Sequence, residues 1–96
     1  VELRIEKEDD RRLRLLTQYI KAALKHARYE LIEDGSRYYG EIPPFQGVYA
    51  VTSNLETCRN ELEEVLEEWI FLRIYNHLEL PVVDGLKLEI NTDIAA

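Results

Sequence analysis

The chain has 96 residues, with 12 basic and 19 acidic side chains and a formal net charge of −7, which suits one globular domain with a modest core rather than a disordered chain. The negative charge disfavours general nucleic-acid binding and favours a basic protein partner, while a single cysteine excludes an internal disulfide framework. No apolar run approaches the roughly 20 residues that span a bilayer and no secretory signal is present, so we expect a cytoplasmic protein without membrane contact.

The first predicted element is an amphipathic helix over residues 9–27. Its apolar side chains recur at three- and four-residue steps, as one face of a helix requires: Leu13, Leu16, Ile20, Ala23, Leu24 and Ala27. Asp9 and Asp10 stand where acids favour a helix N-terminus. A basic stripe runs beside the apolar one and consists of Arg11, Arg14, Lys21, Lys25 and Arg28. It is either a solvated face or a cationic rail for a phosphate backbone or an acidic surface.

Three short strands are predicted next. Residues 29–33 and 37–42 flank an Asp34-Gly35 pair, which is a hairpin signal because both positions of a tight turn require positive φ. Two prolines end the second strand by removing backbone donors, and residues 48–52 form the third. The short links predict an antiparallel meander.

A long helix is predicted over residues 55–76, with Asn54 as its N-cap. Its buried stripe broadens toward the C-terminal end and comprises Leu55, Cys58, Leu62, Val65, Leu66, Trp69, Ile70 and Leu72 to Tyr75. Its other side carries Glu56, Glu61, Glu63, Glu64, Glu67 and Glu68. After a proline, residues 86–90 alternate as a final strand, and residues 91–96 form a tail.

The sequence therefore predicts an α+β fold in a single domain over residues 1–96. Its order is N-terminal helix, three-stranded antiparallel meander, long amphipathic helix and final strand. One helix covers only one face of a small sheet, so the other face needs either the N-terminal helix or a second copy of the chain. We expect a homodimer or a higher homo-oligomer on this ground.

No catalytic pattern stands out in the chain. His26 and His77 lack metal-ligand spacing, and Cys58 falls on the apolar stripe with no base placed beside it. Three hairpin acids could hold a divalent metal, although surface acids on a hairpin are commoner: Glu30, Glu33 and Glu41. We expect no enzyme, no metal site and no cofactor.

The strand tyrosines could in principle stack on nucleic-acid bases. Tyr38, Tyr39 and Tyr49 lie among acids, however, with Arg37 as their only basic neighbour. Packing under a helix or at a dimer seam fits these rings better, and nucleic-acid binding is not expected of them.

Residues 38–75, with weaker agreement on to Ile90, resemble the HicB-like antitoxin family of prokaryotic toxin–antitoxin systems. The family signature is a strand ending in Pro-Asp-Leu-Pro-Gly-Cys, then a short strand and Gly-Asp-Thr-Leu-Glu-Glu-Ala opening a long amphipathic helix. The corresponding stretches here read Pro43-Pro44-Phe45-Gln46-Gly47-Val48 and Thr52-Ser53-Asn54-Leu55-Glu56-Thr57-Cys58. The chain departs from the signature where Thr52 replaces a glycine and Asn54 replaces the threonine cap.

This resemblance implies a partial RNase H-like fold, with its core over residues 28–90 and without the nuclease carboxylates. It also implies that the protein binds and neutralises a small basic toxin that cleaves mRNA. Family members often add a C-terminal DNA-binding module, whereas this chain resembles the domain standing alone, so operator binding is not carried over.

The leading functional hypothesis is a type II antitoxin-like module that occludes its toxin. The residues expected to bind the partner are Glu61, Glu64 and Glu68, spaced at helical steps, with Tyr39 or Tyr49 as an apolar anchor. Two alternatives stay open: a self-associating domain without a toxin, and nucleic-acid binding through the basic stripe of the N-terminal helix.

Overall fold

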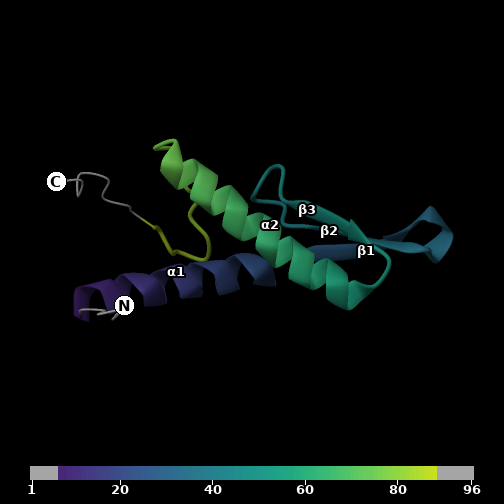
Figure 1. Cartoon of the computed structure of the whole chain (residues 1–96), viewed down its shortest axis with the longest axis horizontal. Helices are drawn as coiled ribbons and strands as arrows, with labels where there is room; N and C mark the ends of the chain where they lie inside the picture. Colours follow the sequence, from purple (N-terminus) through teal and green to yellow (C-terminus); the bar gives the residue numbers. More distant parts are fainter. Residues whose placement is uncertain (1–6, 89–96) are drawn as a thin grey trace, which may run out of the picture.

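The computed structural model describes residues 7–88, with side chains from residue 14 onward, and it has the predicted α+β fold (Figure 1). The elements follow in the order α1 (Lys7–Lys25), β1 (Arg28–Ile32), the 3₁₀ turn η1 (Glu33–Gly35), β2 (Arg37–Glu41), β3 (Tyr49–Thr52) and α2 (Leu55–Tyr75). The two predicted helices end within two residues of their expected positions.

The three strands form the predicted antiparallel meander, in the order β1-β2-β3. Tyr29 pairs with Gly40, and Gly40 pairs with Ala50, so these three residues share one face of the sheet. The hairpin turn is wider than the tight turn predicted from Asp34-Gly35. Glu33, Asp34 and Gly35 all have positive φ, and Ile32 pairs with Arg37 across a four-residue connection.

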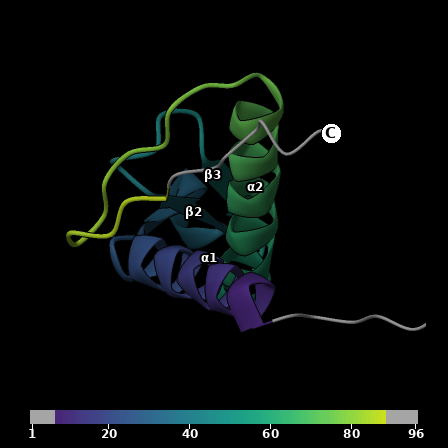
Figure 2. The same ribbon diagram turned by 90° about the vertical axis from the view of Figure 1, so that its left-hand side faces the viewer.

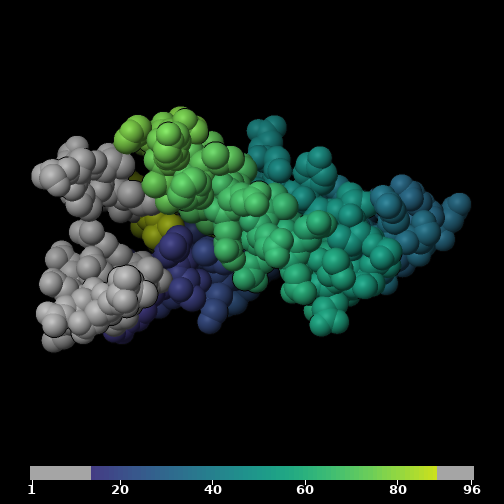
Figure 3. Space-filling model, in the orientation of Figure 1, coloured from purple at the N-terminus to yellow at the C-terminus, as the bar shows by residue number. Residues whose placement is uncertain are grey.

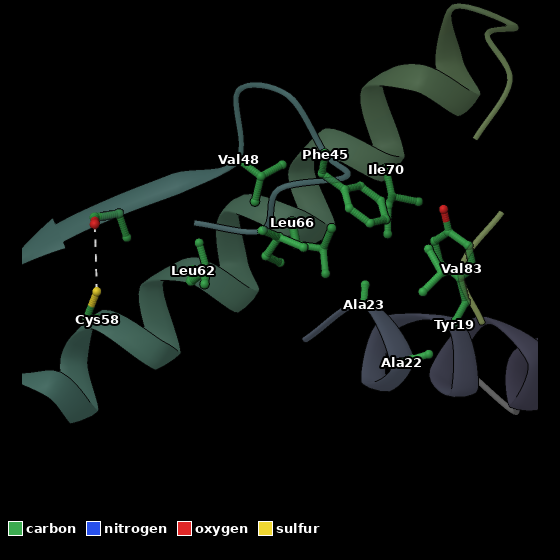
Figure 4. Packing of buried hydrophobic residues seen from close by; sticks show 12 residues of the cluster. Tyr19, Ala22, Ala23, Phe45, Val48, Cys58, Leu62, Leu66, Ile70 and Val83 are labelled. Atoms are coloured by element: carbon green, nitrogen blue, oxygen red, sulfur yellow. Dashed lines mark hydrogen bonds between the residues drawn. The ribbon is translucent and has the colours of Figure 1, made fainter. Parts of the chain in front are cut away.

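The connection between β2 and β3 folds back into the core. The amide of Phe45 donates to the Ile42 carbonyl at 2.8 Å, and that of Val48 donates to the Phe45 carbonyl at 3.1 Å. Gly47, with φ of 93°, makes the turn that these two bonds close. Phe45 and Val48 are buried as a result, so this loop is a wall of the core (Figure 4).

Helix α2 covers one face of the sheet and contacts β2 and β3. Asn54 is its N-cap, since the side-chain oxygen accepts from the Thr57 amide at 2.7 Å. The stripe of Cys58, Leu62, Leu66 and Ile70 is buried against the sheet and the loop, as predicted (Figure 4).

Helix α1 does not cover the second face of the sheet. Its backbone approaches α2 and none of the strands, and it crosses α2 at the end of the molecule away from the β1–β2 hairpin (Figures 1 and 2). Among its described side chains, from residue 14 onward, those of Tyr19, Ala22 and Ala23 are buried. The expectation that α1 or a second copy shields the sheet is therefore wrong for α1, and no described element covers the face opposite α2.

The segment after α2 turns back and comes down to α1 (Figures 1 and 2). The Tyr19 hydroxyl donates to the Pro81 carbonyl at 2.6 Å, and His26 Nε2 lies 2.8 Å from Asp84 Oδ1. Val83 and Leu86 exchange both backbone hydrogen bonds across Asp84 and Gly85. Because Leu86 closes this small turn, the final strand predicted for residues 86–90 is not formed over 86–88. Residues 89 and 90, and the tail, lie outside the described part.

Candidate partner-binding surface

The outer face of α2 is acidic along most of its length. The helix lies at the molecular surface (Figure 3). Glu61, Glu64 and Glu68 are exposed, on the side of the helix away from the buried stripe. The remaining glutamates of this helix, Glu56, Glu63 and Glu67, are also exposed. The three predicted carboxylates therefore form one continuous anionic surface, which we call the acidic face.

The cations of α2 do not neutralise the acidic face, because both fold back onto aromatic rings. The Arg59 guanidinium lies 5.7 Å from the centre of the Tyr29 ring, on the sheet. The Arg73 guanidinium lies 4.8 Å from the Trp69 ring, and its Nε donates to the Glu79 carbonyl at 2.8 Å. Each arginine is thus engaged with the body of the protein and leaves the glutamates facing solvent.

Tyr39 and Tyr49 lie on the other side of the molecule. They alternate with the residues that face α2, so they sit on the open face of the sheet, where their rings stack with centres 6.1 Å apart. The Tyr39 hydroxyl donates to Glu41 at 3.2 Å. Partial desolvation and this hydrogen bond raise the pKa of Tyr39, so its phenol stays neutral. The sheet separates this pair from the glutamates, and the five predicted residues form two surfaces rather than one.

The predicted basic stripe is interrupted in the structure. Arg14, Lys21 and Lys25 share one exposed face of α1, but the helix ends at Lys25. Arg28 instead belongs to β1. The side chain of Arg11 lies outside the described part. Arg28 therefore lies off the helix, as the predicted end of the helix at residue 27 implies, and binding of a phosphate backbone by the stripe stays a prediction.

An apolar patch lies at the C-terminal end of α2, and the sequence reasoning missed it. Leu72 and Tyr75, predicted as buried, are 57% and 72% exposed, and Phe71 and Leu78 are exposed beside them. The signal was present, because every residue of 69–75 except Arg73 is apolar or aromatic. Such a turn has apolar side chains on all sides, and the core buries only one side.

The cysteine and the hairpin carboxylates, which could in principle carry chemistry, form no reactive or metal-binding group among the described residues. Cys58 is fully buried, its thiol donates weakly to the Ala50 carbonyl at 3.7 Å, and burial raises its pKa, so it remains an unreactive thiol. Among the side chains that the structure describes, those of residues 14–88, no group of three or more histidine, cysteine or carboxylate side chains could hold a metal ion. Glu33 lies 3.8 Å from Arg37, away from the Tyr39–Glu41 pair.

Comparison with known proteins identifies the family of this chain. Residues 18–81 match the model of the UPF0150-like family, which is more than half of the chain. The chain belongs to the UPF0150-like family. The matched residues begin within α1 and include the sheet, the acidic face and the apolar patch.

A solved structure of another protein supports this assignment. TTHA0281 from Thermus thermophilus is 36% identical in sequence and superimposes with a TM-score of 0.75. The match covers 80% of this UPF0150-like chain and 95% of the Thermus protein. No curated protein matches the chain. Over residues 7–88, neither helix is both long and apolar enough to cross a membrane.

Proposed function

We propose that this UPF0150-like protein is a non-enzymatic, antitoxin-like binding module of the cytoplasm. Its partner is a small basic protein that cleaves mRNA, and it acts by occluding that partner's RNA-binding surface. The proposal is carried by one observation: α2 presents its glutamates to solvent while both of its arginines are folded back onto aromatic rings. The resemblance of residues 38–75 to HicB-like antitoxins supports the same function.

The acidic face works by imitating a polyanion. A basic ribonuclease carries a surface that attracts phosphates, and regularly spaced carboxylates on a rigid helix offer it a competing negative surface. Opposite surface potentials accelerate encounter, and this acceleration falls with ionic strength because salt screens exposed charges over about 10 Å at 0.1 M. Binding should therefore be fast at low salt and weaker at high salt.

The test is co-expression with the product of an adjacent gene that encodes a small basic protein, followed by co-purification. We expect a complex at low salt whose association slows as salt rises. The triple variant E61K/E64K/E68K should reduce the association rate about tenfold or more. The matched control E56K/E63K/E67K changes the charge equally on the other flank of α2 and should have a smaller effect.

Two results would contradict the proposal. Absence of a complex with the unaltered chain at low salt would remove the protein-binding function. Equal effects of the two triple variants would show that the total charge matters and that the acidic face does not form the contact.

A further inference from the structure

The exposed apolar patch at the end of α2 needs an explanation of its own. Phe71, Leu72, Tyr75 and Leu78 are each more than half exposed, and the rings of Phe71 and Tyr75 stack with centres 6.3 Å apart. Among the described residues these side chains have no covering element. Scattered single apolar residues are ordinary on a protein surface, but a contiguous group on one helix end is typical of an interface.

The patch is held in a fixed shape by the way α2 ends. His77 has φ of 58°, its amide donates to the Ile74 carbonyl, and the Leu78 amide donates to the Arg73 carbonyl. This is the Schellman motif, which turns the chain back and brings the residue after the turn beside the last helical turns. Leu78 is thereby held back against the last turn of α2 by its hydrogen bond to Arg73, and the surface is preformed rather than assembled on binding.

Charge distinguishes this patch from the acidic face. Residues 69–78 contain no aspartate or glutamate, although α2 carries glutamates up to Glu68 and the chain continues with Glu79. Arg73 is turned toward Trp69 and the Glu79 carbonyl. A second copy of this chain, which is repelled by most of the molecule because of its charge of −7, finds here a stretch without carboxylates, bordered by Glu68 one turn before Leu72 and by Glu79 after Leu78.

The size of the patch suits such a contact. Four side chains of this kind present on the order of 400–500 Å² of apolar surface. A standard interface takes roughly 800 Å² from each partner. The patch therefore supplies more than half of one side.

We infer that two copies of the chain associate through Phe71, Leu72, Tyr75 and Leu78, across a two-fold axis at the last turn of α2. A two-fold axis places the same patch on both sides, so aromatic rings meet aromatic rings and leucines. The two helices overlap only at their C-terminal ends and run in opposite directions. Glu68 then borders the contact, while Glu61 and Glu64 lie one to two turns further along α2, beyond the overlap, and remain open to other partners.

The test is the mass of the full chain in solution, measured by sedimentation or light scattering over a range of concentration. At about 100 μM, above the micromolar dissociation constants of weak interfaces, we expect twice the mass of one chain. The variant Y75E should raise the dissociation constant at least about 100-fold, because it places a charge in the contact. Tyr75 is 72% exposed within the chain, so its replacement should leave the circular dichroism spectrum unchanged.

The matched control is Y49E, which puts the same charge on the open face of the sheet, where Tyr49 is 56% exposed. It should leave the mass unchanged. The dimer should also persist in 1 M salt, whereas binding of a basic partner through the acidic face should not. Failure of one proposal is therefore distinguishable from failure of the other.

Three outcomes would overturn the inference. A single-chain mass at 100 μM means that the patch does not join two copies. A dimer that Y49E breaks and Y75E preserves assigns the contact to the sheet. An unaltered mass for Y75E, combined with loss of binding to a basic protein, assigns the patch to that partner instead.

Discussion

Gly40 shows how closely α2 approaches the sheet. A Cβ atom at this position would lie 2.9 Å from the Tyr29 ring carbons and 3.0 Å from Cys58 Sγ. Real Cβ atoms do not approach neighbours so closely, so any side chain forces the helix or the ring to move. The glycine is therefore required by packing rather than by backbone conformation, because it lies inside a regular strand.

We predict that Gly40→Ala destabilises the protein. Inserting a methyl group into this packed junction should lower the free energy of unfolding by about 1–3 kcal/mol, measured by urea denaturation. The double variant with Tyr29→Leu, which removes the nearest ring, should recover part of that loss. An unchanged urea midpoint for Gly40→Ala would show that the helix does not lie as close as described.

Helix α2 illustrates which parts of an element can be predicted from the chain. The predicted start is confirmed, because an Asn54 cap followed by an amphipathic run is a local signal that later packing does not alter. The predicted burial of its last turn is wrong. Burial of Leu72 and Tyr75 depends on whether another element covers the end of the helix, and periodicity carries no information on that.

The other elements also differ in whether local sequence or a distant contact determines their position. The three strands and their antiparallel order follow from short connections, so they are predictable. The position of α1 depends on the contacts of Tyr19 and His26 with a segment about 60 residues away, and no local pattern indicates them. For the candidate site, helical spacing identifies the glutamates, but their separation from Tyr39 and Tyr49 is a property of the folded sheet.

We predict that the N-cap contributes measurably to stability. Asn54→Ala removes the acceptor of the Thr57 amide and should lower the free energy of unfolding by about 1 kcal/mol, measured by thermal or urea denaturation. Asn60→Ala is the matched control, since Asn60 is an exposed residue in the interior of the same helix and alanine is a better helix former there. Equal losses for the two variants would rule out a special role for the cap.

At the scale of the molecule, Tyr19 joins three separate parts. It lies in α1, its ring packs edge-to-face on Phe45 of the loop with centres 6.0 Å apart, and its hydroxyl donates to Pro81 in the exit segment. Burial raises the pKa of Tyr19 to about 12, despite the opposing effect of Arg73. The assembly of helix, loop and exit segment therefore depends on a neutral phenol.

We predict a stability loss at alkaline pH that Tyr19 helps to cause. An unfolded tyrosine ionises near pH 10, whereas the folded one holds its proton to about 12, so the folded state loses stability as pH rises from about 10 to about 12. Tyr19→Phe should be less stable at neutral pH, by about 1 kcal/mol for the lost hydrogen bond, but should lose less on alkalinisation. Urea midpoints at pH 8, 10 and 11 measure both effects, and parallel pH curves for the two proteins would contradict the assignment.

The chain contains a single tryptophan, and its surroundings decide what optical spectroscopy reports. The Trp69 indole donates to the Gln46 carbonyl at 3.1 Å and its ring packs edge-to-face on Phe45, with centres 5.0 Å apart. Its emission therefore reports whether the connection between β2 and β3 stays packed on α2. Opening of the β1–β2 hairpin, in contrast, leaves the contacts of the Trp69 indole intact. Fluorescence and backbone circular dichroism would then track different events whenever this protein opens in stages.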